Sequence, residues 1–503
     1  MIFKTVTELD NKTDKSFFIE LISVYIRLVQ VYCEKYNIDF CSTTDEISVI
    51  KEMTEIGVIS SANDINILRI ILKEKYDDFY TAVGIVIEHK KEITPYVEKL
   101  NNSRRKFLQK KNKDKKPKLV DFFCGAGGLS LGFVQEGFNV VLANDIEDVC
   151  IQTYKYNHPE LPSDKVIQGD IRQIVENIED YVDNDVDIVV GGPPCQGFSE
   201  ANRQRIIDDP RNKLYKFFVK AVEKIGPKVV VMENVKGMLK VADQVVEDYQ
   251  SLRVRKDGKI YSYKVAYKIL NSHDFSVAQS RERLIYIAVR NDIMEHHDIT
   301  PETIFENIDK DCKKNPCYYL QDAISDIKKL DAPRIKNCNE VDNDKTGKKI
   351  DVNDFEQHNN EYLNKINCGR KIPFLYNHKA RFCSDVNYEI YKRLNQGDDA
   401  TDEKIKDIMP YAHRNHCFKD KYFKLIADKP CRTITAHLRM DCHSHIHPYQ
   451  IRSLTPREAA RVQSFPDDYL FLGAYLKTYM QIGNAVPTMM ARGIAKSVKK
   501  YLV

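Results

Sequence analysis

Apolar positions in the first hundred residues recur at helical spacing. Steps of three, four or seven residues predict one apolar helical face, and they connect Ile65, Leu68, Leu72, Phe79, Val83 and Val86. An earlier segment repeats the pattern with Phe18, Leu21, Tyr25, Leu28 and Tyr32. Ser61 and Asp64 resemble a capping box before the second segment. We therefore predict an N-terminal helical accessory region over residues 1–103.

A different pattern begins after Pro117, where short apolar runs are separated by turn residues and helical stretches. These runs cover residues 119–123, 140–143, 187–190, 229–232 and 284–289. Continuous Val and Ile runs spaced for crossover helices predict a mostly parallel sheet that is buried on both faces. The expected fold class is α/β, with a catalytic or binding core over residues 119–300.

The flanks of this core have other textures. Residues 104–118 carry nine basic side chains against one acidic, which is typical of a linker and of a phosphate contact. Residues from about 292 to 440 are polar and rich in Asn, Asp and Lys, so we predict a separate region over residues 301–445. A helix signal returns where Thr455 can cap and Pro456 can occupy the first turn, which assigns residues 446–503 to a final segment.

Composition adds few restrictions. The 503 residues are 43% hydrophobic and 30% charged, with a net charge of +4, so a nucleic-acid partner would have to be met by local basic patches. The start of the chain lacks a basic and apolar leader, and no stretch of eighteen residues is apolar throughout. Thirteen cysteines without a CxxC pair indicate reduced thiols. We expect a cytoplasmic protein with no membrane segment.

Glycines follow the first apolar run, as at a nucleotide site of a doubly wound sheet. Gly125, Gly127 and Gly128 lie there, but Ser130 replaces the third glycine of the dinucleotide fingerprint and no Walker A sequence is present. Asp145 and Asp170 follow the second and third runs, where carboxylates can accept hydrogen bonds from ribose hydroxyls. A cofactor with adenosine and no phosphates fits this pattern; a plain turn with unrelated carboxylates is the alternative.

Three more groups lie near strand ends. Cys195 follows the run 187–190 in the sequence GGPPCQGFS, where it is either a nucleophile or a packing residue. Glu233 follows the next run and can act as a proton donor or cap a helix. Arg281 and Arg283 share one face by strand alternation and suit an anion or carbonyl oxygen, although a surface ion-pair ladder explains such a pair too.

The ordered set of motifs resembles that of the DNA cytosine-5 methyltransferases of bacterial restriction–modification systems. The motifs cover Asp121 to Gly128, Pro193 to Gln196, Glu233 to Val235, Gln279 to Arg283, Arg452 to Glu458 and Gln481 to Pro487. Six motifs in family order, spread over residues 117–503, make coincidence a poor explanation. The resemblance implies methyl transfer from S-adenosylmethionine to carbon 5 of a flipped cytosine in double-stranded DNA, with S-adenosylhomocysteine as product.

The same resemblance implies roles for individual residues. Cys195 would add to carbon 6, Glu233 would contact ring nitrogen 3, and Arg281 with Arg283 would hold the carbonyl oxygen of the base. The cofactor would be bound by Phe123, Gly125, Gly127, Gly128, Asp145, Ile146, Asp170, Ile171, Pro194, Asn484 and Val486. Residues 199–212, with three arginines, resemble the loop that closes on DNA. The fold that the resemblance implies is a Rossmann-like S-adenosylmethionine-binding core over residues 119–300, with a mixed, mostly parallel sheet. Residues 301–445 would then form the target-recognition domain.

Some features of the sequence differ from the family pattern or suggest another kind of site. Ser276 stands where the family usually has glycine, and the first hundred residues match nothing that we identify, so we expect them to pack on the core or to extend the DNA footprint. A cluster of side chains that could bind zinc consists of His437, Cys442, His443, His445 and His447. We nevertheless predict that this cluster binds no metal. We expect a monomer, with a cognate restriction endonuclease as a further partner. An RNA cytosine methyltransferase and an inactive DNA-binding regulator are the alternatives.

Overall fold

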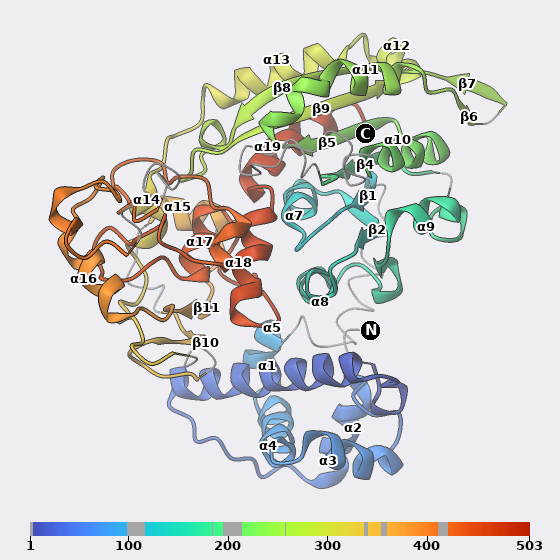
Figure 1. The fold of residues 1–503 in the computed structure, drawn as a ribbon. Coiled ribbons are helices and arrows are strands. Elements are labelled where there is room, and N and C mark those ends of the chain that lie inside the picture. Colours follow the sequence, from blue (N-terminus) through green and yellow to red (C-terminus); the bar gives the residue numbers. More distant parts are fainter. Residues whose placement is uncertain are drawn as a thin grey trace.

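A computed structural model describes residues 4–97, 116–183, 185–194, 214–256, 258–336, 341–353, 360–410 and 421–502. The chain forms a central α/β core, a helical N-terminal part along one side of it and a loop-rich region on another side (Figure 1). The C-terminal segment returns to the core and packs between the loop-rich region and the sheet.

The central sheet has seven strands in the order β3-β2-β1-β4-β5-β9-β8. Five neighbouring strands are parallel: β3 (Val166–Gln168), β2 (Asn139–Asp145), β1 (Lys118–Phe122), β4 (Ile188–Gly191) and β5 (Val229–Asn234). The mostly parallel sheet is therefore confirmed. The run 284–289 differs, because β9 (Glu282–Arg290) is antiparallel to both β5 and β8 (Tyr263–Asn271). Only residues 272–281 separate β8 from β9, which is too few for a crossover helix.

Helices cover both faces of the sheet. Val190 packs on one face with α7 (Gly128–Gln135), α8 (Asp148–Asn157), α12 (Asn291–His297), α13 (Pro301–Cys312) and α19 (Thr488–Lys499). Val189 packs on the other with α9 (Ile171–Glu176), α10 (Leu214–Ile225) and α11 (Ala242–Gln250). Successive residues of one strand thus enter two cores, which explains the continuous apolar runs. A small hairpin of β6 (Val254–Lys256) and β7 (Lys259–Tyr261) precedes β8.

The N-terminal part is helical, as predicted. Its helices are α1 (Lys12–Tyr36), α2 (Glu46–Glu55), α3 (Ile65–Leu72), α4 (Lys75–Glu88) and α5 (Lys90–Val97). Ser61 and Asp64 form the predicted capping box ahead of α3. The apolar face expected over residues 65–86 is split between α3 and α4, since Lys73 has a φ of 52° and ends α3.

The helix α1 has the length and hydropathy of a membrane span, a property that the sequence analysis did not identify. In the structure it is a core helix, and 61% of its most apolar window is buried inside the protein. It packs on α4 and α5 and on the hairpin strand β10 (Gly347–Val352). One continuous apolar cluster joins these helices to Ile350, Phe374, Leu470 and Leu472. The N-terminal part therefore packs on the rest of the protein, which is one of its two expected roles.

The loop-rich region contains α14 (Leu320–Ile324), α15 (Glu361–Ile366), α16 (Asp385–Arg393) and the antiparallel hairpin β10 (Gly347–Val352) and β11 (Phe374–Lys379). The helices α17 (Pro456–Val462) and α18 (Tyr475–Asn484) belong to the final segment. The predicted boundary at residue 301 is too early, because Ile304, Phe305 and Ile308 of α13 pack on the central sheet. A separate small apolar cluster appears only later, around Ile390, Tyr391 and Tyr422.

Candidate active site

The register of the sheet brings the predicted site residues to one edge. Phe122 of β1 pairs with Asn144 of β2 and Gly191 of β4, and Gly191 pairs with Met232 of β5. These four residues are therefore level. The next residue along each strand is a predicted site residue or its neighbour: Phe123, Asp145, Gly192 and Glu233. The carboxyl ends of parallel strands meet at this edge, where ligands bind in folds of this class.

Asp145 and the glycine loop form one half of this edge. The Gly125 N–H donates to Asp145 Oδ2 at 2.8 Å, and the Glu147 N–H donates to Oδ1 at 2.8 Å. Each carboxylate oxygen keeps capacity for a further donor. Gly125 has a φ of 53°, and a Cβ at that position would meet nothing within 4 Å among the described atoms. Ile146 is exposed beside it. The open space beside the Gly125 backbone and the oriented carboxylate of Asp145 together suit the binding of a nucleoside.

The other two glycines of the loop contact protein instead of open space. A Cβ on Gly127 would lie 2.8 Å from both His158 Nε2 and Tyr469 Oη, and one on Gly128 would lie 2.6 Å from the Val486 carbonyl oxygen. Both glycines thus allow segments of the core to approach closely. Contact of Gly127 and Gly128 with the cofactor stays a prediction.

The remaining predicted cofactor residues differ in exposure. Asp170 caps α9 and pairs with Arg172, whereas Ile171 is buried in the core under the sheet. Asn484 is exposed at the end of α18, and Val486 is buried beside the glycine loop. Phe123 is half-buried with a φ of 57°. Ile171 and Val486 therefore support the site through packing, and the exposed groups are Ile146 and Asn484.

Sequence analysis missed a buried polar chain beneath the loop. Tyr154 Oη donates to Ser130 Oγ at 2.8 Å, and the Ser130 hydroxyl in turn donates to Asp121. Burial raises the pKa of Asp121 to about 8. In the sequence Asp121 is only the start of a motif, and Ser130 only replaces a glycine, so neither residue signals this contact. The fold gives Ser130 its role, because α7 places it over the end of β1.

Glu233 and Arg283 form the other half of the edge. Arg283 Nε lies 2.8 Å from Glu233 Oε1, and the two side chains are 14% and 12% exposed. A Cβ on Gly192 would lie 3.0 Å from Glu233 Oε2, so the carboxylate faces the Pro193-Pro194 turn. Asn234 Nδ2 donates to the Pro193 carbonyl oxygen at 2.9 Å and holds that turn. Glu233 therefore points toward the Pro193-Pro194 turn, which directly precedes Cys195 in the sequence.

Arg281 has a different environment from Arg283. It is buried, with Nη1 donating to the Ile434 carbonyl at 2.6 Å and Nη2 donating to the Gly483 carbonyl at 3.0 Å. Burial lowers its pKa. The prediction gave both arginines the same task at the base. The structure instead has Arg281 join three chain segments, because the segment 431–434 and the end of α18 pack over the start of β9.

Ser276 departs from the family pattern at a position with a left-handed backbone. Its φ is 62°, a conformation that glycine adopts without cost. Ser276 Oγ donates to the Pro316 carbonyl at 2.7 Å, which ties this turn to the next segment. The turn geometry is thus compatible with serine.

Two predicted features lie outside the described residues. Cys195 and the loop 199–212 both fall in the range 195–213, and the basic linker falls largely in the range 98–115. Pro194 is the last described residue before Cys195 and is half-buried. The positions of Pro193 and Glu233 therefore define where the thiol-bearing segment begins.

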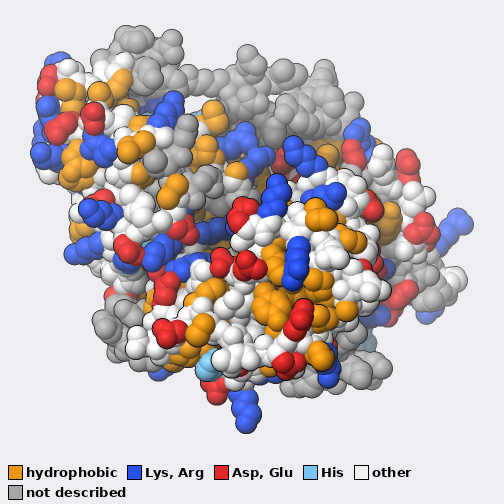
Figure 2. Space-filling model, turned by 90° about the horizontal axis from the view of Figure 1, so that it is seen from below, with side chains coloured by type: hydrophobic (Ala, Val, Ile, Leu, Met, Phe, Trp, Pro, Cys, Tyr) orange, Lys and Arg blue, Asp and Glu red, His pale blue; other side chains and the backbone are white. Residues whose placement is uncertain are grey.

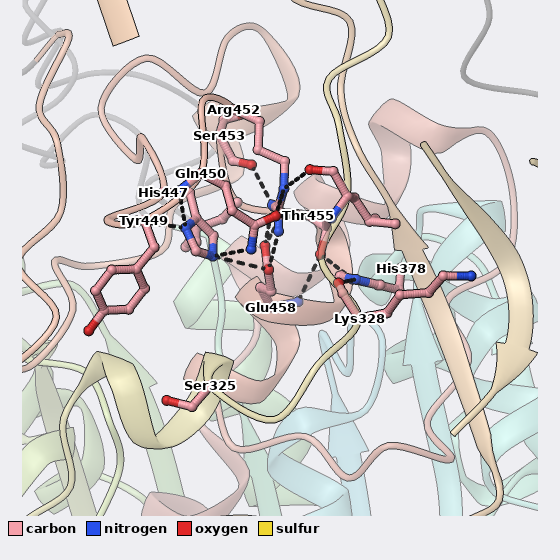
Figure 3. Close-up of polar contacts among 12 residues, drawn as sticks. Ser325, Lys328, His378, His447, Tyr449, Gln450, Arg452, Ser453, Thr455 and Glu458 are labelled. Atoms are coloured by element: carbon pink, nitrogen blue, oxygen red, sulfur yellow. Dashed lines mark hydrogen bonds and ion pairs between the residues drawn. The ribbon is translucent and has the colours of Figure 1, made fainter. Parts of the chain in front are cut away.

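The motif at residues 452–458 is a buried scaffold (Figure 3). Glu458 accepts two hydrogen bonds from Arg452, at 2.6 and 2.7 Å, and one from the Thr455 N–H at 2.8 Å. Thr455 caps α17 and Pro456 occupies its first turn, as predicted. His447 lies 3.5 Å from Glu458, and His378 Nδ1 lies 3.0 Å from Thr455 Oγ1. Arg452 holds the pKa of Glu458 well below its usual range.

Three of the His and Cys side chains at residues 437–447, those of Cys442, His443 and His447, have separate partners. His443 stacks on Tyr422 and bonds to the Tyr391 hydroxyl, and the Cys442 thiol donates to the Leu438 carbonyl. His447 belongs to the Glu458 network. Within the part of the chain that the structure describes, no three His, Cys, Asp or Glu side chains are grouped as a metal site would require.

Comparisons with known proteins identify the same family that the motifs resemble. A family model described as C-5 cytosine-specific DNA methylase matches residues 117–500. The chain is 32% identical over 407 residues to the type II methyltransferase M.DdeI of Desulfomicrobium norvegicum, covering 76% of this chain and 88% of that relative. It is 29% identical over 446 residues to M.Eco47II of Escherichia coli, covering 88% and 90%. The fold resembles a proposed DNA modification methyltransferase encoded within an Escherichia coli prophage, with a TM-score of 0.56 at 24% identity over 77% of this chain and 99% of that one.

Proposed function

The chain belongs to the C-5 cytosine-specific DNA methylase family, and from this premise we propose how its own residues perform the reaction. The protein is an enzyme that transfers a methyl group from S-adenosylmethionine to carbon 5 of cytosine in DNA, with S-adenosylhomocysteine as the product. One observation supports the residue assignment. The level register places Gly125 with Asp145 and Glu233 with Arg283 at one edge of the sheet.

The first pair fits the cofactor. Asp145 would accept hydrogen bonds from the ribose hydroxyls, since both of its oxygens are already oriented by loop N–H groups. Ile146 would pack on the adenine, and Gly125 would let the backbone approach the cofactor closely. Bound S-adenosylmethionine supplies a methyl group that is electrophilic because it is attached to a sulfonium.

The second pair fits the base. The Cys195 thiolate would form a bond to carbon 6, and the electrons of the carbon 5–carbon 6 double bond would make carbon 5 nucleophilic. Glu233 would hold a proton at ring nitrogen 3 and accept from the exocyclic amine, which neutralises charge as the adduct forms. After carbon 5 is methylated, loss of its proton restores the double bond and expels the Cys195 thiolate.

Arg283 would contact the carbonyl oxygen of the base and orient Glu233, because its Nε is already paired with that carboxylate. Arg281 is a positioning residue in this proposal. The target base must leave the stacked duplex to reach Glu233, at a cost of a few kcal/mol that protein contacts offset. The region around α16 would contact base edges in the major groove.

The biological setting follows from the relatives. Both curated relatives are named type II methyltransferases, so we propose that this enzyme modifies one DNA sequence as the partner of a restriction endonuclease. We further propose that it acts as a monomer in the bacterial cytoplasm. An RNA substrate is the less favoured alternative, since the matching family model is specific for DNA.

Transfer of labelled methyl groups tests the proposal. We expect the purified protein to label double-stranded DNA and not RNA, and bisulfite sequencing of the product to show one recurring sequence. Cys195→Ala should abolish labelling while the fold is kept. Labelling of RNA alone, or full activity of Cys195→Ala, would contradict the assignment.

A further inference from the structure

Glu20 of α1 connects two distant parts of the chain. Its Oε1 accepts from Lys349 Nζ of β10 at 2.6 Å and from the Gly473 N–H at 2.9 Å. The Glu20 and Lys349 side chains are 21% and 32% exposed. A single carboxylate oxygen therefore joins the loop-rich region to the C-terminal segment through the N-terminal part.

Other contacts repeat this bridge along the same interface. Arg27 Nε donates to the Ile350 carbonyl at 3.1 Å, and the Tyr96 ring lies edge-on to Phe374 with centroids 4.8 Å apart. The apolar cluster of the helices also includes Leu470 and Leu472. The interface thus has a shared apolar core and polar contacts that fix its register.

The charge of the N-terminal part argues against a role on DNA. Residues 4–97 contain 11 basic and 16 acidic side chains, a net charge of −5, whereas the whole chain carries +4. Figure 2 shows the molecule from this side, and acidic and basic side chains are interspersed there instead of forming a continuous basic face. A surface that binds phosphates needs an excess of Lys and Arg.

The hairpin held by Glu20 leads to the region around α16, the part of residues 301–445 that follows β11; this part is called the target-recognition region below. His378 of β11 contacts Thr455 and the Lys328 carbonyl, and Tyr475 Oη donates to the Lys379 carbonyl at 3.0 Å. Two residues later, Arg381 donates to the carbonyls of Leu438, Arg439 and Met440. Movement of the hairpin would therefore shift both of these chain segments, which lead into the region around α16.

We propose that the N-terminal helices are an internal brace and that Glu20 is a positioning residue for target recognition. The brace sets the orientation of the hairpin β10–β11, and hence of the target-recognition region, against the catalytic core. This inference rests on the proposed function, because it assigns DNA reading to the region beyond β11. It differs from a DNA-binding role in that no residue of the brace contacts DNA.

Steady-state kinetics of the full-length enzyme test the brace. Glu20→Ala should raise the KM for cognate DNA by about five- to tenfold, with kcat and the KM for S-adenosylmethionine changed less than twofold. The dependence of the DNA KM on salt concentration should keep its slope, since no phosphate contact is lost. Lys349→Met should act in the same direction, and the double variant should be no worse than Glu20→Ala. Glu20→Gln, which keeps an acceptor for the Gly473 N–H, should recover part of the loss.

Lys4→Met is the matched control, because Lys4 pairs with Asp14 at an exposed site within the N-terminal part. It should change neither KM nor kcat. An unchanged DNA KM in Glu20→Ala, or a smaller salt slope, would overturn the brace. Hydrogen exchange adds a readout that is independent of activity: residues 347–352 and 470–473 should lose protection in Glu20→Ala and not in Lys4→Met. A wild-type protein that does not methylate DNA would reject the proposed function, and the exchange result would still decide whether Glu20 holds these segments.

Discussion

Two arginine–carboxylate pairs in this protein have the same chemistry and different settings. Glu458 and Arg452 are both fully buried, and Glu458 receives donors from Arg452, the Thr455 N–H and His447. Glu233 and Arg283 keep 12% and 14% exposure, and among the described residues Arg283 is the charged partner of Glu233. The first pair has its hydrogen-bonding capacity filled by protein, whereas the second retains a face toward the Pro193 turn.

The comparison separates scaffold from site. Both pairs belong to sequence motifs of the family, so sequence alone gives them equal standing. Burial and the number of protein partners distinguish them: a filled network fixes geometry, and a partly open pair can exchange partners with a substrate. Substitutions in the two pairs should therefore affect different quantities.

The largest effect is expected for the scaffold pair. Glu458→Ala leaves the Arg452 guanidinium buried without its partner, which should lower the free energy of unfolding by about 3–5 kcal/mol. Thermal unfolding and soluble yield measure this. A variant with wild-type stability would show that Glu458 is not a scaffold residue.

The next largest effect is expected for the site pair, and it should appear in catalytic activity and not in stability. Glu233→Gln keeps the shape and loses the proton-holding carboxylate, so kcat should fall by about 10²- to 10³-fold. The melting temperature should stay close to that of the wild type. Loss of stability without a specific loss of kcat would place Glu233 with the scaffold and break the comparison.

Acid should destabilise the fold through two buried histidines, His378 and His445. Burial lowers the pKa of His378 and of His445 from 6.5 to about 4. Between these two pKa values, the histidines of the unfolded chain bind protons and those of the folded chain do not. The free energy of unfolding therefore falls as the pH drops from about 6.5 to about 4, by up to about 3 kcal/mol for each histidine. Urea unfolding at pH 7.5, 5.5 and 4.5 measures the slope, and His378→Gln should reduce it. A stability that is constant over this range would refute the buried, neutral state of these histidines.

The smallest effect is expected for an exposed pair. Lys264 lies 3.0 Å from Glu302, and the two side chains are 45% and 51% exposed. Lys264→Met should change the free energy of unfolding by less than about 1 kcal/mol and leave methylation unchanged. A large loss of stability here would mean that ion pairs in this protein cannot be ranked by burial.

Sequence patterns predicted much of the fold. The apolar runs gave the strands, their carboxyl ends gave the edge where Asp145 and Glu233 lie, and Thr455 with Pro456 marked the start of α17. The direction of β9 was not predictable from its apolar run, because a buried antiparallel strand has the same composition as a buried parallel one. The end of α3 at Lys73 was missed since lysine gives no signal for a left-handed backbone.

The edge at which the candidate site residues meet was predictable from the strand ends, whereas the contacts of the individual side chains were not. Motif spacing identifies Arg281 and Arg283 equally, and only tertiary contacts with Ile434 and Gly483 separate them. The same holds for Gly127 and Gly128, whose need for glycine comes from distant residues such as Tyr469 and Val486. Glu20 belongs to no recognisable sequence motif. Its contacts join segments that are more than 300 residues apart in the sequence, so only the tertiary structure reveals them.

Covalent trapping on 5-fluorocytosine tests the central claim most directly. Fluorine at carbon 5 cannot leave as a proton does, so a Cys195 thiolate that adds to carbon 6 should stay bonded to the DNA once carbon 5 is methylated. With S-adenosylmethionine and DNA carrying 5-fluorocytosine at the methylated site, we expect a denaturation-resistant complex whose peptide map places the bond at Cys195, and none with Cys195→Ala. Active enzyme that forms no such complex, or a bond at another residue, would contradict the account.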